Sequence, residues 1–274
     1  MNIKSSFKAI GGFLALFGIY HWAEFMVLYR NSPIGFLGIS ALFFVVAALI
    51  GKWQFGNGLK AWGLVFNKRT GLLLAAGLLI GLTVNGITFL TSLYCHIEVI
   101  SFVPEPSAFL KHGALLVFGC CISSLTEDVL TRGYVYCHLH EKMSPSILIL
   151  FSAAIYVLNH IHRLDEPVYI FYLFVIGIHL MIPMLFTGNI WYTLGVHWAG
   201  NIVYHITNNV MHTEEGKNHF PGLVLMLLFM LLLIPINYIA SKKLTVFNTH
   251  MLSTSVKTLT KFVRLMKTMI NPIS

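Results

Sequence analysis

The chain has 274 residues, of which 57% are hydrophobic and 10% are charged, and its formal net charge is +8. Soluble domains carry about 25% charged residues. A soluble fold of this length could not hide so much apolar surface, so lipid must be the solvent for much of the chain. No basic cluster is interleaved with aromatic residues, as it is in single-strand binders. The composition therefore excludes nucleic acid as the expected partner, and the positive charge is interpreted as an orientation signal.

Eight segments are long enough and apolar enough to be membrane helices, each of which needs about 20 residues. They are 8–29, 33–51, 71–93, 114–140, 146–163, 167–186, 189–210 and 220–240. The sequence thus predicts an all-α, polytopic membrane helix bundle with about eight transmembrane helices. We expect two N-terminal helices in 1–60, an intramembrane core in 61–240 and a basic, weakly amphipathic cytoplasmic tail in 241–274.

The distribution of Lys and Arg supports this helix count, because cytoplasmic loops collect these residues. If the N-terminus is cytoplasmic, thirteen of the 18 Lys and Arg residues lie in inner segments and four lie in outer loops, while Arg132 lies within a helix. With one helix fewer, the Lys and Arg residues would no longer be concentrated on one side of the membrane. The pattern predicts a multi-pass protein of the cell membrane, in a bacterial-type plasma membrane, with both termini in the cytoplasm.

The fourth segment carries charges in its middle. A charge near the bilayer centre costs about 2.5–3.5 kcal/mol on insertion scales, so such residues usually face the bundle interior and serve function. Asp128 and Arg132 are spaced i,i+4 and can pair on one helix face. That pairing leaves Glu127 without a local partner. We predict that Glu127 is a general base toward water.

Two further segments place polar residues at a similar depth. Glu127 and His160 lie about 20 and 21 Å from the inner ends of their helices at 1.5 Å per residue. His197 and Asn201 are spaced i,i+4 and lie about 12 and 18 Å from the inner end of theirs. These depths predict one shared site built from three helices. A buried structural ion pair, or histidines and an asparagine that only join helices, is the alternative.

The polar positions also match known motifs. Glu127-Asp128-x-x-x-Arg132-Gly133, Tyr156-x-x-x-His160 and His197-x-x-x-Asn201 resemble the three motifs of the CAAX protease and bacteriocin-processing family. This family, also named CPBP or ABI, includes type II CAAX prenyl proteases and lysostaphin resistance protein A-like proteins. The segments 64–69 and 186–191 are also similar to the family, and the resemblance covers roughly residues 60–210. Asp128 and Tyr156 depart from the family's Glu and Phe.

The resemblance implies an intramembrane endopeptidase. It assigns Glu127 and His160 to water activation and His197 and Asn201 to the oxyanion, with Asp128, Arg132 and Tyr156 in support. It leaves open whether hydrolysis is glutamate-type or metal-dependent; a divalent metal such as zinc would be held by Glu127, His160 and His197. The implied partners are the lipid bilayer and a membrane-associated protein or peptide substrate, either a prenylated CAAX-type protein or a bacteriocin-type precursor.

Two other function classes remain open from the sequence. A non-proteolytic immunity or sequestration protein could use the same scaffold, and it would not need the Glu127 carboxylate. A transporter is disfavoured because there are no inverted repeats or paired broken helices.

Histidines outside the three motifs carry weaker signals. His21 and Glu24 are spaced i,i+3 like half of a di-metal motif. No second copy exists, so we interpret the pair as a local hydrogen bond. His160 and His162 point to different faces of the predicted helix, which argues against a shared metal. His205, four residues after Asn201, could line the same cavity.

Overall fold

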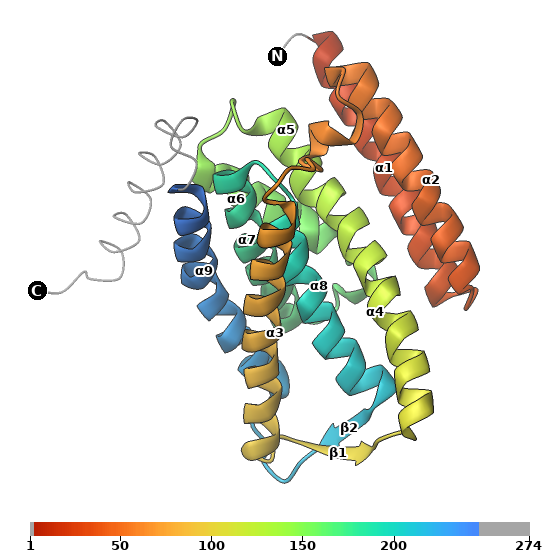
Figure 1. Cartoon of the computed structure of the whole chain (residues 1–274), viewed down its shortest axis with the longest axis vertical. Coiled ribbons are helices and arrows are strands. Elements are labelled where there is room, and N and C mark those ends of the chain that lie inside the picture. The colour runs from red at the N-terminus through yellow and green to blue at the C-terminus, as the bar shows by residue number, and fades with distance from the viewer. Residues whose placement is uncertain (1–2, 247–274) are drawn as a thin grey trace, which may run out of the picture.

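The computed structural model describes residues 3–246 and is a bundle of helices (Figure 1). The bundle helices are α1 (Ile3–Leu28), α2 (Pro33–Phe55), α3 (Thr70–Tyr94), α4 (Pro106–Asp128), α5 (Val135–Leu139), α6 (Pro145–Leu158), α7 (Pro167–Thr187), α8 (Trp191–His205) and α9 (Gly222–Val246). Two π-helical segments, η2 (Val129–Tyr134) and η4 (Ile206–Val210), continue α4 and α8. Two 3₁₀ turns, η1 (Gly58–Trp62) and η3 (Ile161–Arg163), lie between helices.

Each of the eight predicted segments contains a helix, so the predicted all-α membrane bundle is confirmed. Six helical stretches of the described chain are long and apolar enough to cross a membrane, and one of them is the continuous run Pro106–Leu139. The other two helices, α6 and α8, are shorter, with 14 and 15 residues. Part of the predicted tail, up to Val246, belongs to α9; the rest lies outside the described residues.

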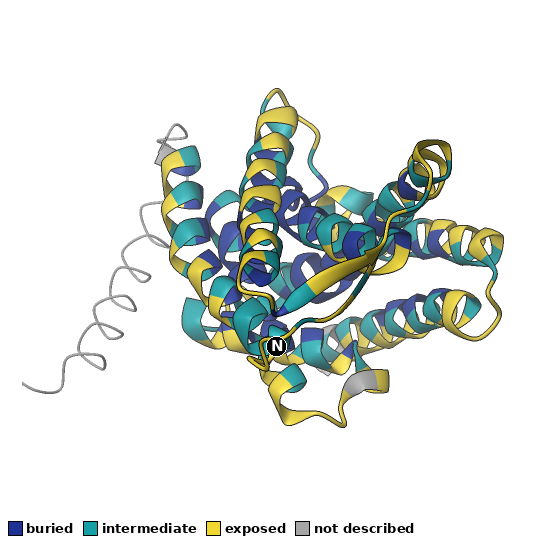
Figure 2. Cartoon of the chain, turned by 90° about the horizontal axis from the view of Figure 1, so that it is seen from below, coloured by how far each residue is buried: buried dark blue, intermediate teal, exposed yellow. Residues whose placement is uncertain are grey.

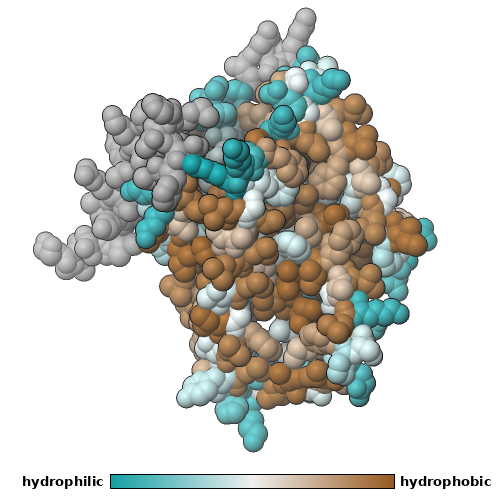
Figure 3. All heavy atoms as spheres, viewed as in Figure 1, coloured by the Kyte–Doolittle hydropathy of each residue, from teal (hydrophilic) through white to brown (hydrophobic). Residues whose placement is uncertain are grey.

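The surface of the bundle matches a lipid environment. Hydrophobic side chains form a broad belt, and hydrophilic side chains gather toward the two ends (Figure 3). Seen from one end, exposed positions follow the outer helix faces and buried positions gather inside (Figure 2). The exposed apolar side chains, among them Leu79, Leu90 and Leu115, are 68%, 64% and 66% accessible. Lipid, rather than protein, is the natural contact for these faces.

Helix α8 lies in the interior and packs closely against α3. A Cβ atom added at Gly77 of α3 would collide with the carbonyl group of Tyr192, and one added at Gly195 of α8 would lie 2.5 Å from the Leu74 carbonyl oxygen. Small residues let two membrane helices approach this closely. Van der Waals contact then stabilises the pair, because lipid provides no hydrophobic driving force between helices. The approach holds the buried face of α8, including His197, at the centre of the bundle.

The structure corrects several predicted boundaries. The predicted helix 146–163 ends at Leu158, so His160 is not helical. The predicted helix 114–140 begins earlier, at Pro106. Two short strands that the sequence did not indicate, β1 (Glu98–Phe102) and β2 (His212–Glu215), pair antiparallel at the end of the bundle away from the start of α1 (Figure 1).

Candidate functional site

The end of α4 and the segment that continues it form a fully buried stretch with several polar residues. Every residue from Thr126 to Val135 is buried. The helix widens there into the π-helical segment, a feature that occurs frequently at functional sites. Thr131 Oγ1 donates to the Glu127 carbonyl oxygen at 2.7 Å, and Ser152 Oγ of α6 donates to the Thr131 carbonyl oxygen at 2.7 Å. The two hydroxyl groups satisfy carbonyl groups in the irregular turn, where water is excluded.

Asp128 joins a cation and a histidine. Its Oδ1 atom lies 3.0 Å from Arg132 Nη1, and both side chains are fully buried, so the predicted i,i+4 contact forms. The same oxygen lies 3.0 Å from His197 Nδ1 of α8, a contact that the sequence did not indicate. Because a carboxylate only accepts, Nδ1 of His197 must carry a proton. Asp128 therefore sets the tautomer and orientation of the His197 ring, in the way that carboxylates orient catalytic histidines.

Glu127 has partners from two other parts of the fold. Its Oε2 atom lies 3.5 Å from His197 Nε2, and its Oε1 atom lies 3.8 Å from His160 Nδ1. Asn159 Nδ2 donates to Oε1 at 3.3 Å. The expectation that Glu127 lacks a local partner holds within its own helix, but tertiary packing provides three polar neighbours. The Glu127 side chain is 5% exposed and that of His160 is 22% exposed, so the cluster opens on the His160 side.

The end of α6 positions His160. In a continuing helix, the backbone N–H of His160 would bond the carbonyl oxygen of Tyr156. Instead it donates to the Val157 carbonyl oxygen at 2.9 Å, and the His160 ring takes the Tyr156 carbonyl oxygen through Nδ1 at 2.9 Å. Side-chain bonds of this kind compete with helical ones and end helices. Since a carbonyl oxygen cannot donate, Nδ1 carries the proton and Nε2 keeps the lone pair.

Tyr156 packs over the buried cation. The guanidinium Cζ of Arg132 lies 4.3 Å from the centre of the Tyr156 ring, which is cation–π geometry. The same ring lies 4.7 Å from the His160 ring and 6.0 Å from the His197 ring, centre to centre. An aromatic residue at this position therefore packs against the cation and near both histidine rings.

Asn201 lies beside this cluster and contacts α4 one turn earlier. Its Nδ2 atom donates to Ser124 Oγ at 2.9 Å, which uses one of its two N–H bonds. The structure thus gathers Glu127, Asp128 and His197 directly, while Asn201 follows one turn along α8. His205 Nδ1 accepts a hydrogen bond from Asn209 Nδ2 at 2.7 Å, in the π-helical continuation of α8.

Sequence reasoning missed two polar residues of the site, Asn159 and Ser124. Asn159 is fully buried and contacts Glu127, and Ser124 is fully buried and holds Asn201. The position of Asn159 next to His160 was the available signal, since a polar pair at the end of an apolar helix is costly unless both side chains find partners.

Two segments singled out in the sequence lie together and anchor the start of α8. Asn189 Nδ2 and Trp191 Nε1 both donate to the Val65 carbonyl oxygen, at 3.1 and 3.0 Å. The rings of Phe66 and Trp191 lie 4.8 Å apart, centre to centre. Gly133 also permits close contact, because a Cβ there would collide with the carbonyl group of Trp62. These contacts place the loop 63–66 against the start of α8 and the end of η1 against η2.

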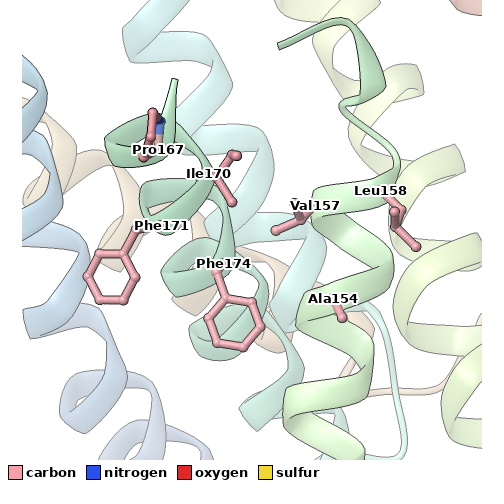
Figure 4. Close-up of a pocket in the computed structure, with 7 residues that line it drawn as sticks. All are labelled: Ala154, Val157, Leu158, Pro167, Ile170, Phe171 and Phe174. Carbon is pink, nitrogen blue, oxygen red and sulfur yellow. The ribbon is translucent and has the colours of Figure 1, made fainter. Parts of the chain in front are cut away.

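Helices α6 and α7 also form an apolar pocket of about 430 Å³ (Figure 4). The side chains that line it are Ala154, Val157, Leu158, Pro167, Ile170, Phe171 and Phe174. It contains no titratable group and therefore cannot perform acid–base chemistry. In a membrane it is suited to a hydrocarbon chain.

The comparisons with known proteins bear on this geometry. Residues 110–203 match the family model for type II CAAX prenyl endopeptidase Rce1-like proteins. Through this segment the chain is similar to the CAAX protease family. The matched segment contains the end of α4, the α6 turn and the start of α8, which together carry all three motifs. Nothing matches the chain among curated proteins or among solved structures.

The family resemblance predicted from the sequence is thereby confirmed over this segment, and the chain is a multi-pass membrane protein. The candidate residues can also be tested as metal ligands. A carboxylate and two imidazoles are suitable zinc donors. However, the His160 nitrogen nearest to Glu127 is the one that donates to the Tyr156 carbonyl oxygen, and a protonated nitrogen cannot ligate. In this arrangement Nδ1 of His160 is not available to an ion beside Glu127.

Proposed function

We propose that the protein is an intramembrane endopeptidase that hydrolyses a peptide bond through the Glu127 carboxylate. The observation that carries the proposal is the contact of Glu127 with both motif histidines, at 3.5 Å for His197 and 3.8 Å for His160, inside a family-matched segment. Two other parts of the fold converge on one buried carboxylate of α4, which a helix-joining role alone would not require.

Water activation belongs to Glu127 and His160. A water between the Glu127 carboxylate and the open side of His160 would lose its proton to Glu127 as its oxygen attacks the scissile carbonyl. Nε2 of His160 has the lone pair that accepts a hydrogen bond from this water. Glu127 then passes the proton to the leaving amine, so the products are a carboxylic acid and an amine. Positioned general bases contribute about 10²–10⁴-fold to such reactions.

His197 and Asn201 are the proposed oxyanion donors. With Nδ1 committed to Asp128, a protonated His197 donates from Nε2 toward the reacting carbonyl oxygen. Its positive charge and that of Arg132 balance the Asp128 and Glu127 carboxylates, and a neutral cluster is the least costly charge arrangement in a buried site. One N–H bond of the Asn201 amide group donates to Ser124 Oγ, and the second can donate to the reacting carbonyl oxygen.

The proposed substrate is membrane-associated, because the site is enclosed by membrane helices. A prenylated CAAX-type protein and a bacteriocin-type precursor both have this property. The apolar pocket between α6 and α7, which begins one turn before His160, is consistent with a substrate that carries hydrocarbon.

Comparing the membrane peptides of cells that express the wild type or Glu127→Gln tests the proposal. Gln keeps the shape of the side chain but removes the base, so cleavage should fall by at least about 10²-fold. The matched control is Glu141→Gln, because this carboxylate is 83% exposed at the end of the same helical run. The control should cleave at the wild-type rate.

One result would favour the alternative function, sequestration of a peptide without cleavage. If a substrate is identified and Glu127→Gln cleaves it as fast as the wild type, the peptidase proposal is wrong. A protein that retains binding of the peptide but never cleaves it would instead be the sequestration protein that the sequence left open.

We also propose that both ends of the given chain face the cytoplasm. The start of α1 and the end of α9 lie at the same end of the bundle (Figure 1), and the Lys and Arg distribution places that end inside. Reporter fusions at Phe55 and after Ser274 should read inside, and a fusion near Pro104 should read outside. An external reporter signal after Ser274 would contradict this orientation.

A further inference from the structure

A second cluster of metal-type ligands lies beside the proposed catalytic cluster. His21 and Glu24 of α1 and His162 of η3 each offer one ligand atom, and these atoms all lie within 4.8 Å of one another. The local contact predicted from the sequence is present, with His21 Nδ1 2.8 Å from Glu24 Oε2. The fold adds His162, more than 130 positions away in the chain, which sequence spacing could not have paired with them.

The His21 ring has a lone pair that no protein donor uses. Because the Glu24 carboxylate only accepts, Nδ1 of His21 donates to it and Nε2 carries the lone pair. Nε2 is buried and has no hydrogen-bond partner among residues 3–246. An ion shared with Glu24 would bind at Nδ1, the ring nitrogen that faces the carboxylate, and the ring proton would then move to the unpartnered Nε2 atom.

The donor set and its surroundings suit zinc. Two imidazoles and one carboxylate are a known set of three protein ligands for zinc, with water in the fourth position. Outer hydrogen bonds also hold the ligands: Tyr20 Oη donates to Glu24 Oε1 at 3.2 Å, and Tyr29 Oη lies 3.4 Å from His162 Nδ1. Partners of this kind orient metal ligands and tune their basicity.

We propose that His21, Glu24 and His162 bind a divalent transition-metal ion of the zinc class. Tetrahedral zinc separates its ligand atoms by about 3.3 Å, given metal–nitrogen distances near 2.0–2.1 Å. The three ligand atoms must therefore come closer together when the ion binds. His162 can move toward His21 and Glu24, because its side chain is exposed on a three-residue turn. The ion would tie α1 to the segment that carries His160, two residues before His162. This site is separate from Glu127 and does not depend on the proposed proteolysis.

The test is zinc binding to the purified full chain in detergent, after removal of metals with a chelator. Titration calorimetry should show one zinc ion per wild-type chain. His162→Gln and His21→Gln should each weaken binding by at least about tenfold, the lower end of what even outer partners contribute. Cobalt(II) in place of zinc should give the visible absorption of a tetrahedral site, and His162→Gln should remove it. Melting curves without metal will verify that each variant is folded.

Two matched variants separate this site from others. His112→Gln replaces another exposed histidine, on α4, and should leave zinc affinity unchanged. Glu127→Gln should also bind zinc normally. The proposal is overturned if the wild type binds no zinc, or if folded His162→Gln binds it as tightly as the wild type. Loss of binding in Glu127→Gln with retention in His21→Gln would move the ion to the catalytic cluster and equally overturn it.

Discussion

Two clusters of one glutamate and two histidines lie on either side of the same turn. In the first, Glu127 is 5% exposed and contacts His160 and His197. In the second, Glu24 is 24% exposed and lies near His21 and His162. His160 and His162 are two residues apart, so one short segment contributes to both. The ligand types are the same, but the surroundings differ.

The difference lies in what holds each ring. In the inner cluster, an Asp128–Arg132 pair fixes the His197 tautomer, and the Tyr156 carbonyl group fixes that of His160. In the outer cluster, tyrosine hydroxyl groups support the ligands, and no group among residues 3–246 holds Nε2 of His21. Buried fixed charges suit proton transfer, whereas a ring that can move its proton from Nδ1 to Nε2 suits an ion. The following predictions test this contrast, from the largest effect to the smallest.

The inner cluster should depend on its buried ion pair for stability. Asp128→Ala leaves Arg132 as a lone buried cation and should cost about 3–5 kcal/mol of unfolding free energy. Glu127→Ala keeps that pair and should cost less. Glu24→Ala, in the outer cluster, removes a partly exposed contact and should cost about 1 kcal/mol or less without metal. Denaturation in detergent measures all three, and equal stability of the Asp128 and Glu127 variants would argue against the role assigned to the pair.

The proton that Asp128 holds on His197 should control cleavage. Asp128→Asn keeps the size of the side chain but removes the negative charge that holds the Nδ1 proton, so His197 no longer carries a proton on both nitrogens. The turnover number should fall by about 10²-fold or more, as when the orienting carboxylate of a catalytic triad is replaced. KM should change little, and the pH–rate profile should shift, because the change acts on protonation. A rise in KM at unchanged turnover number would indicate a role in binding instead.

Asn159 should assist Glu127 more weakly. Asn159→Ala removes the N–H group 3.3 Å from Glu127 Oε1. Hydrogen bonds to charged groups contribute about 1.5–3 kcal/mol, so cleavage should fall by at least about tenfold. Asn57→Ala is the matched control, since the Asn57 side chain is exposed and caps no helix. Rate assays of the two variants that gave equal values would remove Asn159 from the site.

Tyr156→Phe should have the smallest effect. The ring face that covers Arg132 is retained, and Phe is the residue expected from the family resemblance. Stability should change by about 1 kcal/mol or less, the range of cation–π contributions away from strongly desolvated sites. Cleavage should remain near the wild-type rate. A large loss of cleavage in a folded variant would instead give the Tyr156 hydroxyl group a chemical role.

The sequence by itself determined the class of the protein and the polar positions within its membrane helices. Lipid demands long apolar helices, and the cost of burying charge marks Glu127, Asp128 and Arg132 without any coordinates. The i,i+4 contact between Asp128 and Arg132 is likewise local, so helical spacing predicted it. Both deductions use only the periodicity of one helix and the chemistry of the solvent around it.

Tertiary structure alone decided where α6 ends and which rings meet. The helix ends at Leu158 because the His160 ring takes the Tyr156 carbonyl oxygen and Asn159 reaches Glu127, and neither contact is visible in hydropathy. The contact of Asp128 with His197 requires the close packing that brings α8 into the bundle interior, and the approach of His162 to His21 requires α1 to lie against the η3 turn. Sequence periodicity specifies which face of a helix is polar, but the neighbour of that face depends on how the helices pack, so both glutamate–histidine clusters became visible only in the folded chain.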